Sequence, residues 1–170
     1  MSDLPDDCQP GPSHSAIERI LPHRYPFLLI DQVTEFVPGQ RIAAVKHFSV
    51  NDAASQGYSA SAEVVPMGII FETVTQLGAI LVLERPEMAG KVAMILQVPL
   101  ARTLALIRPG DTLRVEAEVV KLRENFGELR GTAYRDGVLV AEGQMRFGIA
   151  NAADLGLSQA APGRESSERT

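Results

Sequence analysis

A long and nearly uninterrupted run of apolar residues, MGIIFETVTQLGAILVL, begins at Met67 and constrains the fold of this chain more than any other feature. Pro66 stands before the run and Pro86 follows it. Proline suits the first turn of a helix but ends a helix that reaches it later, so the sequence predicts a helix over residues 67–85. Because this helix is apolar on almost every side, other elements must enclose it.

Two polar side chains, Glu72 and Gln76, interrupt this apolar run. The run is near the lower length limit for crossing a bilayer, but an ionisable side chain at its middle is unfavourable in lipid. We therefore expect no membrane span and a buried helix in a soluble protein. The chain has 170 residues, of which 45% are hydrophobic, and this is enough for one domain with its own core.

Composition also limits the cellular setting and the partners. Cys8 is the single cysteine and cannot form an intramolecular disulfide, and the acidic start MSDLPDDCQPGPS lacks the basic and apolar regions of a secretory signal. We expect a cytoplasmic protein. The formal net charge of −5 argues against a nucleic-acid partner, since proteins that bind nucleic acid carry basic surfaces.

Strand-like segments surround the predicted helix. Apolar and polar side chains alternate from residue 112 to 121, and Pro38-Gly39 and Asp136-Gly137 are turn signals, so we expect antiparallel strands joined by short turns. A capping-box pattern, Ser15-x-x-Glu18, predicts a short helix near the start of the chain. The expected strands span Leu28–Val37, Arg41–Val50, Lys91–Ile107, Thr112–Lys121, Leu129–Arg135 and Val138–Phe147.

An antiparallel sheet curled around one enclosed apolar helix is the hot-dog architecture, so we expect an α+β fold of this kind. The domain is expected over residues 15–150, between flexible tails at 1–14 and 151–170 that are rich in Ser, Ala, Gly, Pro and charge. Such a half-barrel leaves strand edges exposed. We therefore expect a homodimer or a higher even oligomer.

Glu72 is the main candidate for chemistry. It is the only charged side chain of the predicted helix before Glu84, and Gln76 lies four residues later on the same face. A buried carboxylate is costly unless it is paired, and this leaves two interpretations. Glu72 is either a catalytic acid or a structural carboxylate that is hydrogen-bonded to Gln76 or to a loop N–H.

The histidines leave the chemistry open. His23 lies between two prolines in LPHRYPF, where it either orders the loop or takes part in catalysis. His47 lies on an expected strand, and alternation does not decide which face it takes. No Ser or Cys stands at a spacing that indicates a nucleophilic triad, and no cluster has metal-ligand spacing. We expect neither a metal nor another cofactor.

Several motifs together resemble one protein family. They are LPHRYPFLLID at Leu21–Asp31, Gln56-Gly57, the pair Glu72-x-x-x-Gln76, Ala101-Arg102 and Pro109-Gly110-Asp111. Their combination is similar to the FabZ-type (3R)-hydroxyacyl-[acyl carrier protein] dehydratases of bacterial fatty acid synthesis, and the resemblance covers residues 17–148 without a large gap. It implies a hot-dog dimer that acts on acyl thioesters of acyl carrier protein or coenzyme A in fatty acid or related lipid or polyketide biosynthesis.

The resemblance also implies roles for individual residues. In that family a loop histidine works with the helix glutamate of the neighbouring subunit to remove an α-proton and expel the β-hydroxyl as water. By position, Glu72 matches that glutamate and Tyr58 stands where the family has its histidine, while His23 is a further catalytic candidate. The implied substrate-binding residues are Gly57, Met67, Gly68 and Gln76, and the implied residue for carrier-protein docking is Arg102.

Four changes surround the implied site. Tyr58 replaces the histidine, and Ser59-Ala60-Ser61 replaces Phe-Pro-Gly. Met67 replaces the glycine after the helix-start proline, and Leu104-Ala105 replaces two basic residues. A free phenol titrates about 3.5 pH units above a free imidazole, a difference of about 5 kcal/mol in proton affinity. Together these changes predict that ordinary dehydratase turnover is weakened or lost.

Three functions therefore remain open from the sequence. The chain is a dehydratase-like hydro-lyase that uses Glu72 with His23 or Tyr58, and the charged residue retained in an apolar helix favours this interpretation. Alternatively, it is a non-catalytic hot-dog subunit that binds an acyl chain or pairs with an active dehydratase paralogue in a heterodimer. The third option is a thioesterase, since hot-dog thioesterases also combine a helix carboxylate with a polarised carbonyl.

Replacing Tyr58 by His tests whether only the base is missing. A large rise in the rate of 3-hydroxyacyl thioester dehydration in Tyr58→His would show that the pocket and Glu72 remain competent and that only the base is missing, because an imidazole is largely a free base near neutral pH and a phenol is not. The rate is measured from the absorbance of the conjugated enoyl thioester. Tyr58→Phe is the control, since it adds no base. An unchanged rate in Tyr58→His would place the defect in the rebuilt loop instead.

Overall fold

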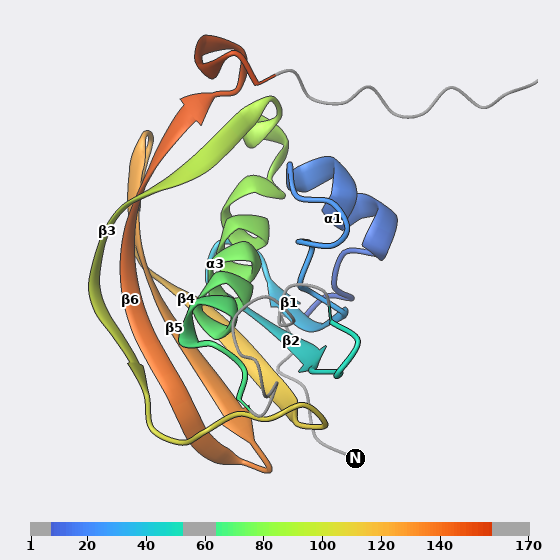
Figure 1. Cartoon of the computed structure of the whole chain (residues 1–170). Helices are drawn as coiled ribbons and strands as arrows, with labels where there is room; N and C mark the ends of the chain where they lie inside the picture. The colour runs from blue at the N-terminus through green and yellow to red at the C-terminus, as the bar shows by residue number, and fades with distance from the viewer. Residues whose placement is uncertain (1–7, 53–63, 158–170) are drawn as a thin grey trace, which may run out of the picture.

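The computed structural model describes residues 8–52 and 64–157 and shows a curved antiparallel sheet wrapped around one helix (Figure 1). The sheet has six strands in the order β1-β2-β4-β5-β6-β3. The expected α+β hot-dog architecture is confirmed. The elements are α1 His14–Ile20, β1 Gln32–Val37, β2 Arg41–His47, α3 Met67–Leu83, η1 Pro86–Met88, β3 Lys91–Thr103, β4 Thr112–Arg123, β5 Phe126–Arg135, β6 Val138–Asn151 and η2 Ala153–Leu155.

Helix α3 forms the centre of the core, with the concave face of the sheet on one side and α1 on the other (Figure 1). Leu77, Ile80 and Leu81 are completely buried. The helix begins at Met67 as predicted, with Pro66 as its N-cap, and ends at Leu83, two residues earlier than expected. None of the helices in residues 8–52 and 64–157 is long and apolar enough to span a membrane.

The predicted hairpins and strand faces are confirmed. Strands β1 and β2 pair antiparallel across the Pro38-Gly39 turn, with Val37 opposite Arg41. Asp136 and Gly137 both adopt positive φ angles, 51° and 78°, as a two-residue hairpin turn between twisted strands requires. On β4, the side chains at 113, 115 and 117 are buried, and those at 114, 116 and 118 are half-buried or exposed.

The cap of the first helix differs from the expectation. The capping box expected at Ser15 is wrong, because α1 already begins at His14 and the Oγ of Ser13 accepts a hydrogen bond from the N–H of Ala16 at 3.4 Å. Ordered contacts are also present near both ends of the described residues. The N–H of Gln9 donates to the carbonyl of Phe36 at 2.9 Å, and η2 follows the last strand.

Two opposed glycines fix the depth at which α3 lies against the sheet. Gly131 on β5 and Gly143 on β6 are directly paired in register. A Cβ at position 131 would lie 2.0 Å from Cγ1 of Val74, and a Cβ at position 143 would lie 2.3 Å from the ring of Phe71. The side chains of Val74 and Phe71 therefore occupy the space that the Cβ atoms of larger residues at positions 131 and 143 would need.

We expect Gly131→Ala to destabilise the fold by about 1–3 kcal/mol, since overpacking of a dense core forces side chains and backbone apart. The free energy of unfolding is measured by urea denaturation. Val74→Ala removes the methyl group that the new Cβ meets. The double variant is therefore expected to lose less free energy of unfolding than the sum of the losses in the two single variants. Strictly additive effects would contradict the close contact.

Candidate active site

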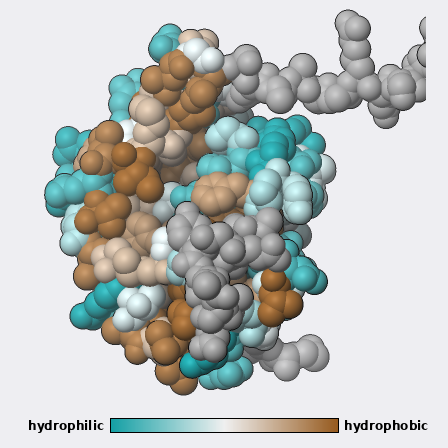
Figure 2. All heavy atoms as spheres, in the orientation of Figure 1, coloured by the Kyte–Doolittle hydropathy of each residue, from teal (hydrophilic) through white to brown (hydrophobic). Residues whose placement is uncertain are grey.

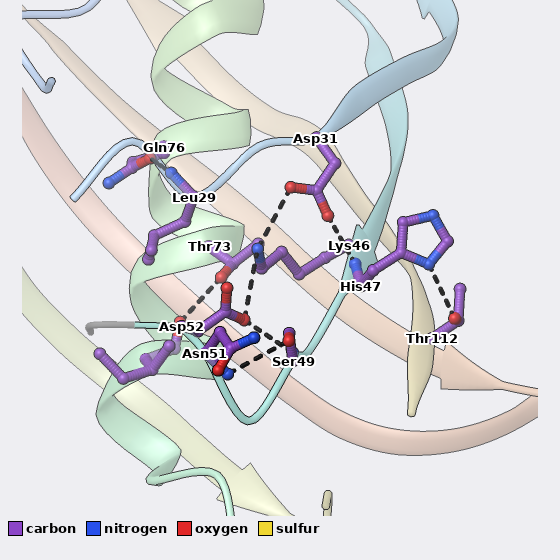
Figure 3. Close-up of polar contacts among 11 residues, drawn as sticks. Leu29, Asp31, Lys46, His47, Ser49, Asn51, Asp52, Thr73, Gln76 and Thr112 are labelled. Atoms are coloured by element: carbon purple, nitrogen blue, oxygen red, sulfur yellow. Dashed lines mark hydrogen bonds and ion pairs between the residues drawn. The ribbon is translucent and has the colours of Figure 1, made fainter. Parts of the chain in front are cut away.

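The site is built around a carboxylate and an amide on one face of α3. Glu72 lies in the second turn and Gln76 one turn further on, completely buried. The Nε2 of Gln76 donates to Oε1 of Glu72 at 2.9 Å and to the carbonyl of Phe27 at 2.8 Å. Its Oε1 accepts a hydrogen bond from the N–H of Leu29 at 2.9 Å, and Figure 3 shows Gln76 and Leu29 beside each other. The buried amide is fully hydrogen-bonded and orients the carboxylate.

His23 meets Glu72 from the loop between α1 and β1. Its Nε2 lies 3.4 Å from Oε1 of Glu72, and the two side chains keep 30% and 23% of their surface exposed. The ring also packs against Phe27, with 6.1 Å between the ring centroids. The Nδ1 atom is buried and has no hydrogen-bond partner among the described residues. An imidazole and a carboxylate from one chain are thus in contact, and both can be reached from solvent.

The loop that carries His23 is fixed at both ends. At its start, Nη1 of Arg24 donates to the carbonyls of Leu21 and His23 at 2.8 and 2.7 Å. At its end, Asp31 accepts hydrogen bonds from Nζ of Lys46 at 3.2 Å and from the N–H of His47 at 2.6 Å (Figure 3). These contacts hold the loop against β2 while Gln76 holds its middle against α3.

Lys46 is a buried cation that the sequence did not single out. Only 6% of its surface is exposed, and its ammonium group lies 3.2 Å from Asp31, 3.9 Å from Asp52 and 5.6 Å from the ring centroid of Phe48. A buried charge requires such partners, so this cluster fixes the chain where β2 ends (Figure 3). No sequence pattern indicated that Lys46 is buried, because alternation on a short strand does not show which of its side chains are enclosed.

The remaining predicted residues occupy different places. His47 is exposed, and its Nδ1 faces Oγ1 of Thr112 at 2.8 Å instead of Glu72 (Figure 3). Met67 and Gly68 are exposed at the start of α3, where Pro66 supplies no side-chain cap for the first N–H groups. Gly57 and Tyr58 lie outside the described residues. Within residues 8–52 and 64–157 no group of three or more His, Cys, Asp and Glu side chains is placed to hold a metal.

Arg102, the expected docking residue, is exposed on β3, and its guanidinium is paired with Glu142 on β6. The two residues are direct neighbours in the strand register. Together with Met67 and Phe71 they line a narrow hollow near the start of α3. The sequence identified the arginine but not the carboxylate that binds it, because the register of two distant strands was not known.

Comparison with known proteins decides the family. Residues 21–144 match the sequence profile of the FabA-like domain. The chain belongs to the FabA-like family. This FabA-like chain is 42% identical over 134 residues to 3-hydroxyacyl-[acyl-carrier-protein] dehydratase FabZ of Symbiobacterium thermophilum, covering 79% of the chain and 94% of the relative. It is 41% identical over 133 residues to the FabZ of Enterococcus faecalis, covering 78% and 94%.

Solved structures share the fold of this FabA-like chain. The dehydratase heterocomplex ApeI:P from Xenorhabdus doucetiae matches with a TM-score of 0.71 and 19% identity, covering 82% of this chain and 93% of that one. A hot-dog-like protein from Thermanaerovibrio acidaminovorans matches with a TM-score of 0.59 and 24% identity, covering 71% and 88%. The FabA-like chain is therefore a homologue of the FabZ dehydratases with a hot-dog fold, as the sequence motifs indicated.

We expect Gln76→Met to lower the free energy of unfolding by about 2–4 kcal/mol, because it leaves the buried N–H of Leu29 and the partly buried carbonyl of Phe27 without partners. Urea denaturation measures the loss. Thr75→Val is the matched control, since the Thr75 hydroxyl donates only to the carbonyl of Phe71 within the same helix, and its loss is expected to stay below about 1 kcal/mol. Equal effects of the two substitutions would refute the anchoring role of Gln76.

Proposed function

We propose that this protein dehydrates a 3-hydroxyacyl thioester in the cytoplasm, and that Glu72 and His23 of the same chain form its acid–base pair. The supporting observation is the 3.4 Å separation between Oε1 of Glu72 and Nε2 of His23. The resemblance to the family implies a histidine from the loop that here carries Tyr58. His23 supplies an imidazole to the carboxylate from a different loop.

The reaction needs one group that accepts a proton and one that donates a proton. The Cα–H bond breaks, its electron pair forms the Cα=Cβ double bond, and the Cβ–O bond breaks. The released hydroxyl leaves as water once it has received a proton. A carboxyl and imidazole pair that holds one proton at the start holds one again at the end, because the proton gained from Cα equals the proton lost to water. No cofactor is required.

The start of α3 is the proposed site of the thioester carbonyl. Negative charge develops on this oxygen when the α-proton leaves, and exposed N–H groups at a helix N-terminus stabilise such charge. Met67 and Gly68 lie there, one turn before Glu72. The carrier of the thioester is acyl carrier protein or coenzyme A, and Arg102 is proposed to contact an acidic carrier although Glu142 already balances part of its charge.

A second copy of the chain is proposed to pair along β3. This strand is an edge of the sheet and exposes four large apolar side chains, and hydrophobic residues gather over its side of the molecule (Figure 2). Exposed apolar edges favour association with another strand, so a homodimer or a higher even oligomer is proposed. The four side chains are Met94, Ile95, Leu96 and Val98.

A heterodimer with an active dehydratase paralogue is the second candidate. Tyr58 at the position of the family histidine supports it, because a chain without that base can still lend Glu72 to a partner that has one. The structure from Xenorhabdus doucetiae that shares this fold is a dehydratase heterocomplex. In this arrangement the contact between His23 and Glu72 would only position the carboxylate.

The test compares three histidine and glutamate variants of the purified protein on 3-hydroxyacyl thioesters of acyl carrier protein and coenzyme A. Glu72→Gln and His23→Asn are each expected to lower kcat at least about 100-fold, because each removes one partner of the proton transfer. His47→Asn is the matched control and is expected to change kcat less than about 3-fold, since His47 faces Thr112. Formation of the enoyl thioester and release of free thiol are followed separately.

The outcomes separate the candidates. Full turnover of His23→Asn together with loss in Glu72→Gln would refute the pair within one chain. Thiol release without enoyl formation would instead identify a thioesterase. A parent protein that is inactive alone but co-purifies with a dehydratase paralogue would favour the heterodimer over independent dehydration. Thermal denaturation of each variant shows that lost turnover is not lost folding.

A further inference from the structure

A second hollow lies at the other end of α3 from Glu72. It has a volume of about 300 Å³ and is bordered by α1, the end of α3, η1 and the start of β3. Glu84 at this end lies twelve positions after Glu72, which corresponds to roughly 18 Å along a helix axis. The hollow is therefore separate from the proposed active site, and its volume falls at the lower end of the range for ligand pockets.

Three cationic side chains from three different elements border this hollow. Arg19 comes from the last turn of α1, Arg85 follows α3, and Lys91 begins β3. Glu84 is the one carboxylate that borders it. The protein as a whole carries a net charge of −5, so this concentration of positive charge is opposite in sign to the net charge of the chain. A compact anion would be attracted to it.

Arg85 also has an unused donor. Its Nε is buried and has no hydrogen-bond partner among the described residues, although its Nη1 lies 3.4 Å from Oε1 of the exposed Glu87. Basic side chains near a helix C-terminus are favourable for the helix dipole, and this explains the presence of Arg85 and Arg19 in general. It does not explain the approach of Lys91 from β3. An anion in the hollow, bound by the guanidinium and ammonium groups that border it, would explain this approach.

We propose that this hollow binds a phosphate group. Guanidinium and ammonium groups together are the usual protein partners of phosphate oxygens. The carboxylate of Glu84 faces the same space and can accept a hydrogen bond from a protonated phosphate oxygen, but not from sulfate, which has no proton at neutral pH. The site is independent of the proposed dehydration, so either proposal can fail without the other.

Isothermal titration of the full chain with inorganic phosphate, at constant ionic strength, tests the proposal. Saturable binding is expected, with sulfate binding more weakly. Arg85→Gln and Lys91→Gln are each expected to weaken phosphate binding at least about 10-fold. Glu84→Gln changes the charge in the opposite direction and is expected to tighten the binding of sulfate. Arg130→Gln, which removes an exposed positive charge on β5 that does not border the hollow, is the matched control and is expected to have no effect.

A second arm identifies the source of the phosphate. Coenzyme A that binds more tightly than inorganic phosphate, and that also loses affinity in Arg85→Gln, would assign the site to a phosphate of a thioester carrier. Coenzyme A no tighter than phosphate would assign it to the free ion. Absence of saturable binding, or equal weakening by Arg130→Gln, would overturn the proposal. Lys91→Gln is retained as the decisive variant if Arg85→Gln lowers the melting temperature.

Discussion

The buried amide of Gln76 is the interaction on which the arrangement of the site depends. It is enclosed completely, and a buried amide is tolerated only when its donors and acceptor are satisfied. Its partners are the backbone at Phe27 and Leu29 and the carboxylate of Glu72. The path of the loop and the orientation of the carboxylate are therefore coupled, and His23 reaches Glu72 because the same loop is held at this point.

The sheet contributes the second constraint, because it sets how close α3 lies. The paired Gly131 and Gly143 leave the backbone of β5 and β6 open to Val74 and Phe71. In a helix, residues 71 and 74 lie three positions apart on one face, and Glu72 and Gln76 form another. One face is thus pressed against the sheet while the other is turned to the loop. A less closely packed helix would leave the carboxylate without a defined position.

Local patterns predicted most helices and strands but not all of their bounds, and not the contacts between them. The strand expected from Leu28 begins at Gln32, and the strand expected to reach Ile107 ends at Thr103. The start of α3, the hairpin at Asp136-Gly137 and the alternation on β4 depend on neighbouring residues and were predicted correctly. The cap at Ser13 was missed, because two serines stand near the same helix start and only the backbone conformation decides between them. The meeting of His23 with Glu72 joins residues 49 positions apart in the chain. The sequence offered His23 and Tyr58 as alternative partners of Glu72, and the three-dimensional path of the loop shows that His23 contacts it.

The two ends of α3 have opposite electrostatic character, and the side chains around them follow from it. At its start the first N–H groups carry partial positive charge, and Pro66 makes no side-chain hydrogen bond to them, so this end favours negative charge. At its end the free carbonyls carry partial negative charge, and Arg19, Arg85 and Lys91 gather there. The positive charge of these three side chains exceeds the negative charge of about half an elementary charge that the helix dipole places at this end. Their excess is the reason that the far end of the helix attracts an anion of its own instead of only neutralising the carbonyls.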